Sequence, residues 1–277
     1  MEAQIKDKTY WHDAFFEALQ LEFHQYLDAL KFIDEHPLSK EALIIDVLVI
    51  KKESDIVIEK NIGKIFKAIN LFEFKSEKDA LTIHDYNKVM GYGYLYASSN
   101  RVHVSDITIS FAVTIHPRNL LDYLENDRKF TITYSKDGIY RIDGDTFTVQ
   151  ILESKKLSSE KNLFLKNLRS NLDIAEAKRT VDAYKTIKEF ESKNAYIYRL
   201  TGANPAVFKE LIEVSDAAIR ETIIMALAEE GGFLRERDQL RDMEKARAIA
   251  GGLKQDNVPI TIIVKNTGLT LQEVEAL

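Results

Sequence analysis

An acidic residue interrupts an apolar run near the N-terminus, and this feature constrains the fold more than any other. Residues 42–50 read ALIIDVLVI, with Asp46 at the centre. A short run this rich in Ile, Val and Leu predicts a strand that is buried on both faces. A lone carboxylate inside such a strand is costly, so Asp46 must be paired with a cation, protonated, or bound to a metal.

A second apolar run, AINLFEFK at residues 68–75, carries Glu73 and Lys75. Alternate residues of a strand point to the same face, so these two side chains are expected to lie together. If this strand neighbours the strand of Asp46, two acids and a lysine meet, which predicts a divalent-metal site with an adjacent cation. The alternative is a buried Asp46–Lys75 or Glu73–Lys75 ion pair with a purely structural role, which is the weaker reading because such pairs are rarely net stabilising.

Composition sets the outer limits of the interpretation. The 277 residues include no cysteine, which excludes disulfides, thiolate zinc sites and cysteine nucleophiles. The N-terminus lacks the apolar core of a signal peptide, and no segment approaches the roughly 20 apolar residues of a membrane span, so we expect a soluble cytoplasmic protein. Basic and acidic residues balance within residues 156–277, so the net charge of -6 falls on residues 1–155. That charge opposes strong non-specific DNA binding but does not exclude a nuclease, because metal-binding carboxylates add negative charge themselves.

Apolar periodicity gives the expected order of elements. The order is a helix, three strands, a helix and a strand, at residues 10–30, 42–50, 56–59, 68–75, 84–97 and 104–113. Asp-Gly turns then punctuate further short strands up to about residue 153, and the pattern is helical from Ser158 onward. We therefore predict an α/β domain at residues 1–155 and a helical region at residues 156–277.

The last segment, residues 258–277, carries clear helix boundary signals. Pro259 suits a helix start, Gly268 suits a helix end, and Thr270 with Glu273 forms a capping box. Two short helices about a tight turn are expected, resembling half of a helix-turn-helix. The segment is too short for a full recognition helix, so packing or weak association is favoured over DNA contact.

The element order, Asp46 and the Glu73-Phe74-Lys75 triplet together resemble the PD-(D/E)XK nuclease superfamily, which has the restriction-endonuclease-like fold. Their surroundings and the closing segment are similar to the bacterial branch that is related to transposases and recombination-promoting nucleases. The resemblance covers roughly residues 10–115 and the tail. Ile45 stands where the motif usually has a proline.

The resemblance implies a fold and a chemistry. The fold is α/β, with a restriction-endonuclease-like core on a mixed sheet and a mostly helical C-terminal extension. The activity is Mg²⁺-dependent hydrolysis of DNA phosphodiester bonds, with Mn²⁺ as a possible substitute. Asp46 and Glu73 would hold the metal with the Phe74 carbonyl as a third ligand. Lys75 would orient or deprotonate the attacking water, or stabilise the charged phosphate.

Superfamily members often add an acid from the first helix, and the candidates here are Glu17 and Glu22. On a helical wheel Glu22 lies roughly 80–100° from the centre of the apolar stripe, and Glu17 lies about 140° from it. Glu22 is therefore expected to border the packed face and join the catalytic residues, whereas Glu17 is expected to face solvent. The alternative is that both are solvated helix acids.

The helix at residues 84–97 provides candidate nucleic-acid contacts. Related exonuclease families have Gln-x-x-x-Tyr in this helix, and Lys88 and Tyr92 have that spacing here, with Lys88 in place of the glutamine. Tyr86, Tyr94 and Tyr96 could also stack on bases, although packing in the core and at its rim is the favoured interpretation for them.

Three hypotheses follow from the sequence. The first is a DNA nuclease that uses Asp46, Glu73 and Lys75. The second is a catalytically inactive protein of the same fold that binds nucleic acid or a protein partner. The third is a structural or regulatory protein whose helical region forms a homo-oligomer.

Overall fold

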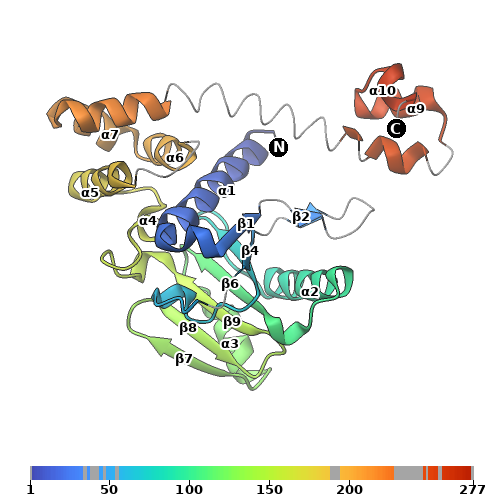
Figure 1. The fold of residues 1–277 in the computed structure, drawn as a ribbon, viewed down its shortest axis with the longest axis horizontal. Helices are drawn as coiled ribbons and strands as arrows, with labels where there is room; N and C mark the ends of the chain where they lie inside the picture. The colour runs from blue at the N-terminus through green and yellow to red at the C-terminus, as the bar shows by residue number, and fades with distance from the viewer. Residues whose placement is uncertain are drawn as a thin grey trace.

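The computed structural model describes most of the chain and is drawn in Figure 1. The described residues are 2–33, 36–37, 44–45, 48–53, 56–187, 194–227, 246–247, 249–254 and 258–275. Asp46 lies outside them.

A mixed seven-stranded sheet forms the centre of the fold, with the strand order β1-β4-β5-β6-β9-β8-β7 (Figure 1). The three strands β5, β6 and β9 are mutually parallel, and the other neighbours are antiparallel. A separate two-stranded ribbon pairs β2 with β3. The strands are β1 (Leu30–Ile33), β2 (His36–Pro37), β3 (Ile44–Ile45), β4 (Leu48–Lys52), β5 (Ile69–Lys75), β6 (Ile107–Val113), β7 (Thr131–Ser135), β8 (Ile139–Asp143) and β9 (Thr148–Glu153). The predicted α/β class and mixed sheet are confirmed.

Helices surround this sheet and make up most of the chain after β9. The α-helices are α1 (Glu2–Glu22), α2 (Ile83–Asn100), α3 (Arg118–Asn126), α4 (Leu163–Asn167), α5 (Ile174–Thr186), α6 (Ala195–Ala203), α7 (Pro205–Val214), α9 (Ile260–Thr267) and α10 (Leu271–Glu275). Residues 217–227 are also helical. The 3-10 turns are η1 (His24–Ala29), η2 (Asn61–Gly63), η3 (Val104–Asp106) and η4 (Ser154–Lys156).

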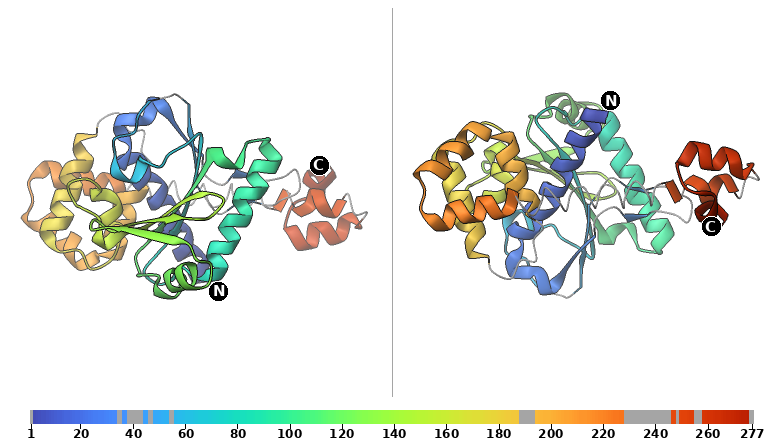
Figure 2. Two further views of the ribbon diagram at one scale, coloured as in Figure 1. Left: turned by 90° about the horizontal axis from the view of Figure 1, so that it is seen from below. Right: turned by 90° about the horizontal axis from the view of Figure 1, so that it is seen from above.

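The two faces of the sheet pack against different helices. On one face Phe74 of β5 stacks on Phe15 of α1, with ring centroids 4.7 Å apart. On the other face Leu71 of β5 belongs to the cluster that contains Val89 of α2. Both views of Figure 2 place α2 on one side of the sheet and the yellow and orange helices of the C-terminal half on the other. Alternation along β5 therefore assigns Glu73 and Lys75 to the α2 face.

The N-terminal part of the chain departs from the sequence prediction. The first helix ends at Glu22 rather than near residue 30, and residues 30–33 form the edge strand β1 on β4. Pairing with β4 outweighs the helical periodicity here, because a local pattern is a weaker determinant than a partner strand. The strand predicted at residues 56–59 is also absent: Ile58 is buried, Val57 is 74% exposed, and these residues pair with no strand. The three strands that precede α2 in the sheet are thus β1, β4 and β5.

The centre of the chain follows the prediction closely. Strand β5 and helix α2 form where expected, and α2 begins with a capping box between Thr82 and Asp85. Gly93 within α2 reflects close packing, because a Cβ there would lie 2.7 Å from the ring of Phe147. The strand expected from residue 104 starts at Ile107, after the 3-10 turn η3.

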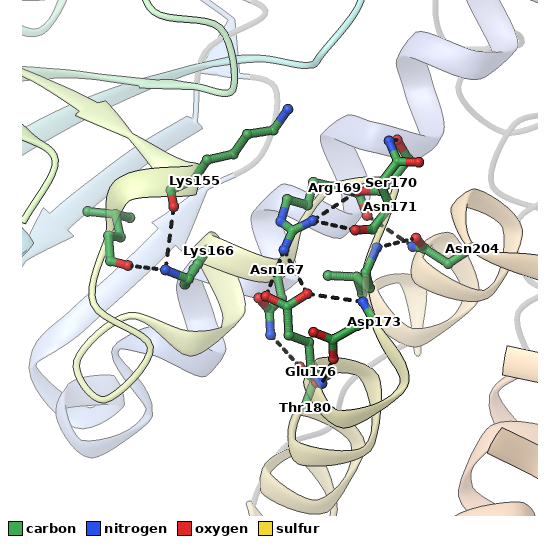
Figure 3. Close-up of polar contacts among 12 residues, drawn as sticks. Lys155, Lys166, Asn167, Arg169, Ser170, Asn171, Asp173, Glu176, Thr180 and Asn204 are labelled. Atoms are coloured by element: carbon green, nitrogen blue, oxygen red, sulfur yellow. Dashed lines mark hydrogen bonds and ion pairs between the residues drawn. The ribbon is translucent and has the colours of Figure 1, made fainter. Parts of the chain in front are cut away.

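The helical half shares a core with the sheet. One continuous apolar cluster includes Phe15 of α1, Phe72 of β5, and residues of α4 to α7. Polar contacts join these short helices, as Figure 3 shows: Arg169 donates to both carboxylate oxygens of Glu176 at 2.8 Å, and Asn204 accepts from the Leu172 amide at 2.9 Å. The change from strands to helices falls where the sequence places it, and the division into two domains stays a prediction.

The tail forms the two short helices expected of it. Gly268 ends α9 in the left-handed region with φ 72°, which a residue without a Cβ adopts at little cost. The Glu273 amide donates to the Thr270 hydroxyl at 3.3 Å, and the Thr270 amide donates to the Glu273 carboxylate at 2.9 Å. Ile263, Leu269 and Val274 are part of a small core of this unit, which Figure 1 draws apart from the sheet. Within the described residues, no helix is both long and apolar enough to cross a membrane.

Candidate functional site

Strand β5 positions Glu73 and Lys75 side by side at its C-terminal end. Both are buried, with relative exposures of 7% and 4%. Glu73 lies opposite Phe111 of β6 and Lys75 lies opposite Val113, while on the other side the pairing with β4 ends at Phe72 opposite Leu48. The two side chains point toward α2. They lie in the part of β5 that continues past Phe72, the last residue of β5 with a described partner in β4.

Lys75 sits among three carboxylates, and we call Glu73, Lys75, Asp79 and Asp85 the Lys75 cluster. Its Nζ lies 2.8 Å from Asp85 Oδ1, 3.1 Å from Asp79 Oδ2 and 3.5 Å from Glu73 Oε1. Asp79 comes from the turn after β5, and Asp85 from the first turn of α2. The structure thus brings together the predicted Glu73 and Lys75 and adds two acids that the sequence analysis missed.

A signal for Asp85 was present in the sequence. Thr82 and Asp85 have the capping-box spacing directly before a predicted helix, and the Asp85 carboxylate accepts from both the amide and the hydroxyl of Thr82, at 2.9 and 2.6 Å. Such an acid must lie at the helix N-terminus, which packs near the end of the preceding strand. No comparable signal marks Asp79, which is a turn residue.

The electrostatics of the cluster fix the charge state of Lys75. Burial disfavours the ammonium form, but the hydrogen bond with Asp85 and the charges of Glu73 and Asp79 outweigh it and raise the pKa of Lys75 to about 12. Burial likewise disfavours the charged form of Asp85, yet its bonds from Lys75 and Thr82 lower the pKa of Asp85 to about 2. At neutral pH, Lys75 is therefore a cation and Asp85 an anion.

The backbone carbonyl of Phe74 points toward the β4 side of β5. The Lys75 carbonyl accepts from the Thr114 amide on the β6 side, at 3.2 Å, and the Ala68 carbonyl accepts from the Lys52 amide on the β4 side, at 2.9 Å. Carbonyls alternate along a strand, so the Phe74 carbonyl shares the direction of the Ala68 carbonyl. It lies beyond the last described pair of these two strands, Phe72 with Leu48, the first residue of β4.

These groups have the chemistry that Mg²⁺ prefers, although the described residues do not complete a site. A carboxylate from Glu73 and a carbonyl from Phe74 are hard oxygen donors. Among the side chains that the structure describes, no group of three or more histidines and acids is arranged to hold a metal ion. The donor set fits a magnesium ion in kind, and the predicted third ligand, Asp46, lies outside the described residues.

The structure does not bring Glu22 to this cluster. Glu22 is buried near the C-terminal end of α1, where its Oε1 accepts from the amides of Phe164 and Leu165 at 2.7 and 3.0 Å. Its other oxygen lies 2.6 Å from Lys60 Nζ. Helix α1 also packs on the face of the sheet opposite Lys75. Glu22 therefore lies away from the Lys75 cluster and caps the N-terminus of α4. The expectation of a catalytic Glu22 finds no support here.

The expectation for Glu17 was wrong. It is only 3% exposed, and its carboxylate accepts from the Tyr184 hydroxyl at 2.8 Å and from the Tyr196 amide at 2.7 Å. The apolar stripe did not reveal this because α1 is covered on a second side by α6, whose first turn needs an acceptor. Burial leaves the pKa of Glu22 raised even with its partners. The two acids have different roles in the helical half, because Glu22 binds amides of α4 and Glu17 binds the first turn of α6.

Lys88 and Tyr92 lie on one face of α2, as their spacing predicts. The Lys88 Nζ is 5.3 Å from the centroid of the Tyr92 ring. The two residues continue the line of Asp85 at three- and four-residue steps, so they extend from the Lys75 cluster along the helix. Of the other tyrosines, Tyr86 and Tyr96 are buried as core residues, which agrees with the favoured interpretation.

A second polar cluster, which no pattern in the sequence predicts, lies at the end of β9. We call His116, Tyr140, Glu153 and Lys156 the Glu153 cluster. One carboxylate oxygen, Glu153 Oε2, lies 3.0 Å from His116 Nδ1, from the Tyr140 hydroxyl and from Lys156 Nζ. Burial alone would raise the pKa of Glu153, but the bonds from Lys156, His116 and Tyr140 lower it from its usual value. The only sequence hint is that Glu153 ends an apolar strand.

Both clusters lie at the same edge of the sheet. Lys75, Val113 and Glu153 are in register across the parallel strands β5, β6 and β9. The loop after β5 also approaches the turn after β9, because Glu77 Oε2 lies 3.8 Å from Lys155 Nζ. The carboxyl ends of parallel strands are where open α/β sheets usually bind ligands. This edge is therefore the candidate functional site.

No family model, no curated protein and no solved structure matches the chain. The functional interpretation therefore depends on the residues themselves.

Proposed function

We propose that the chain is a Mg²⁺-dependent nuclease of the PD-(D/E)XK type that hydrolyses DNA phosphodiester bonds at the Lys75 cluster. The observation that carries the proposal is the convergence of Glu73 and Lys75 at the end of β5, with Lys75 Nζ 3.5 Å from Glu73 Oε1. The order α1, β1, β4, β5, α2, β6 supports it, with β5 parallel to β6 and antiparallel to β4. This is the order that the resemblance implies, with β1 in place of the strand expected at residues 56–59.

Chain connectivity limits how far Asp46, a ligand implied by the resemblance, can lie from strand β4. It precedes Leu48, the first residue of β4, by two residues, and Leu48 is opposite Phe72. Two residues span at most about 7 Å, so the Cα of Asp46 cannot be farther than that from the Cα of Leu48. The Phe74 carbonyl points toward the β4 side of β5. Asp46, Glu73 and Phe74 are accordingly the proposed ligands.

The chain's own groups have separable tasks in this proposal. A bound Mg²⁺ would activate a water molecule and neutralise charge on the scissile phosphate. Lys75 is an ammonium at neutral pH, so it acts as a cation that orients the nucleophile and stabilises phosphate charge rather than as the base. Asp79 and Asp85 hold that ammonium in place, at 3.1 and 2.8 Å. Lys88 and Tyr92 would contact the DNA beyond the reacting phosphate.

A second candidate is a catalytically inactive protein of the same fold that binds nucleic acid or a protein partner. The observation in its favour is that Lys75 already contacts three carboxylates of its own chain, which is what a structural ion-pair node requires. Such a node would join β5 to the start of α2 with no need for metal. Titration calorimetry with Mg²⁺ or Mn²⁺ separates the two candidates, because an inactive node predicts no stoichiometric binding that depends on Glu73.

The test of the proposal is cleavage of supercoiled plasmid DNA by the purified full chain with Mg²⁺ and with EDTA. We expect cleavage only with Mg²⁺, and its loss in Asp46→Asn and in Glu73→Gln. The matched controls are Asp28→Asn and Glu59→Gln, which change exposed acids away from the cluster and should cleave at the wild-type rate. Full activity in Glu73→Gln, or equal activity in EDTA, would refute the proposal.

A further inference from the structure

An exposed tyrosine lies at the far end of the same edge. Tyr134 of β7 is 46% exposed, and its ring stacks on that of Tyr140, with centroids 4.6 Å apart and an interplanar angle of 29°. Tyr140 is 7% exposed and its hydroxyl is held by Glu153 at 3.0 Å. The buried ring therefore fixes the exposed one, which leaves a preorganised aromatic surface open to solvent.

Strand register sets the distance between this surface and the Lys75 cluster, although Phe111 and Ile151 in the same row are buried. Glu73, Phe111, Ile151, Tyr140 and Tyr134 are successive partners across β5, β6, β9, β8 and β7. Paired residues point to the same face of a sheet, so the row ends with Glu73 at one side and Tyr134 at the other. Four strand spacings separate them, or about 19 Å. At roughly 3.4 Å of rise per nucleotide of one strand, this distance accommodates several nucleotides.

Hydrogen-bond donors lie between the two ends. The His116 side chain is 43% exposed, and its Nδ1 donates to Glu153 Oε2 at 3.0 Å, which fixes the ring and directs Nε2 away from the carboxylate. Because neutral imidazole carries a single N–H, the ring donates from Nε2 to a phosphate only as an imidazolium. The Lys156 side chain is 47% exposed and is held by the same carboxylate at 3.0 Å. A single buried acid thus orients an imidazole and an ammonium next to the aromatic surface, which is an arrangement suited to an anionic ligand.

We propose that Tyr134, His116 and Lys156 form a binding track for one unpaired nucleic-acid strand that leads to the Lys75 cluster. A base stacks on Tyr134, and backbone phosphates bind His116 and Lys156. Single strands expose the base faces that an aromatic platform needs, whereas a duplex hides them. The direction of the track toward Glu73 rests on the proposed nuclease function, but the binding itself does not.

The experiment measures binding without cleavage. Fluorescence anisotropy of a labelled single-stranded oligodeoxynucleotide, in EDTA and low salt, gives Kd for the full chain and its variants. We expect Tyr134→Ala to raise Kd about tenfold, within the range for loss of one base–aromatic stack, and Tyr134→Phe to bind like wild type. His116→Gln and Lys156→Gln should each weaken binding several-fold, and Lys156→Gln should also lower the salt dependence by about one phosphate contact.

Matched controls lie at other places on the molecule. Tyr94 is 47% exposed and its ring is tilted against that of Phe147, with centroids 4.9 Å apart. His103 is an exposed histidine just before η3, which precedes β6, so it lies at the opposite edge. Tyr94→Ala and His103→Gln should leave Kd unchanged. An unchanged Kd in Tyr134→Ala, or tighter binding to duplex than to single strand, would overturn the track and leave cleavage at Glu73 untouched. Conversely, loss of binding in Tyr134→Ala by a chain that never cleaves DNA would support the track and count against the nuclease.

Discussion

The Lys75 cluster and the Glu153 cluster occupy one edge of the sheet but invert each other's charge arrangement. In the first, one ammonium is surrounded by three carboxylates. In the second, one carboxylate is surrounded by an ammonium, an imidazole and a hydroxyl. The first therefore carries surplus negative charge and the second surplus hydrogen-bond donors.

This inversion gives the two clusters complementary uses. Surplus carboxylate oxygens attract a divalent cation, and surplus donors attract a phosphate. A site that binds a phosphodiester chain together with magnesium needs carboxylate oxygens for the metal and hydrogen-bond donors for the phosphates, close to each other. A purely structural explanation would account for each cluster alone, but it gives no reason for their common row and their opposite charge balance.

Replacement of Lys75, the ammonium at the centre of its cluster, should have the largest effect on cleavage. In Lys75→Met the phosphate loses its ammonium, and we expect the rate of plasmid cleavage to fall by about 10²–10³-fold, as for loss of one transition-state donor. The three carboxylates also lose their counter-charge, which should lower the free energy of unfolding by about 2 kcal/mol, a modest value because Asp79 is partly exposed. Initial rates and thermal unfolding of the same preparations measure the two effects.

The control for this variant is Lys64→Met, which changes an exposed lysine in the turn after η2. It should match wild type in both measurements. A Lys75→Met protein that unfolds earlier yet cleaves at the wild-type rate would reduce the Lys75 cluster to a structural node, and the contrast between the two clusters would lose its functional meaning.

Glu22 tests whether any buried acid is needed for cleavage or only the acids of the Lys75 cluster, because Glu22 is buried but lies outside both clusters. It is a buried acid on the other face of the sheet, bound to Lys60 and to two amides of α4. Glu22→Ala leaves these partners unsatisfied, and we expect the free energy of unfolding to fall by about 3 kcal/mol. Denaturant titration measures this value. If the variant stays folded but loses all cleavage, Glu22 belongs to the catalytic residues after all, as the resemblance implied.

Sequence reasoning succeeded where local pattern and environment agree. Strand β5, helix α2 and the order of later strands follow from periodicity, and the spacing of Glu73 and Lys75 gives their shared face directly. It failed where a distant partner decides the outcome. Residues 30–33 are a strand because β4 lies beside them, and Glu17 is buried because α6 covers α1.

The candidate site divides in the same way. Asp85 was accessible through its capping-box spacing with Thr82, whereas the Glu153 cluster unites three elements through strand pairings that no local signal reveals. His116 has no local partner in the sequence, because Glu153, which it contacts, is 37 residues away along the chain. Long-range register, rather than residue type, was the missing information.

Metal binding should stabilise one cluster and not the other. A ligand that binds only the folded chain raises the free energy of unfolding by about 2.7 kcal/mol at a concentration of 100 times its Kd. We therefore expect Mg²⁺ to raise Tm in the wild type and to have no effect in Glu73→Gln, while Lys156→Gln should keep the full response. An equal rise in all three proteins would mean that Mg²⁺ binds elsewhere. A response that is lost only in Lys156→Gln would reverse the assignment of the clusters.

The smallest expected effect is the acid sensitivity of the Lys75 cluster. The pKa of Asp85 is about 2 in the folded chain, below its ordinary value of 3.8, so its contribution to stability is present above pH 3.8 and is lost as pH falls through about 2. Asp85→Asn removes that contribution at all pH values.

The wild type should thus be more stable than Asp85→Asn at pH 6, and the difference in the free energy of unfolding should shrink steadily below pH 4. Because Asp85 is partly exposed, solvent screening keeps the difference small. Urea titrations from pH 2 to 6 measure it. A constant difference over this range would show that Lys75 does not depend on the charge of Asp85, and that Asp85 serves α2 only as a neutral cap.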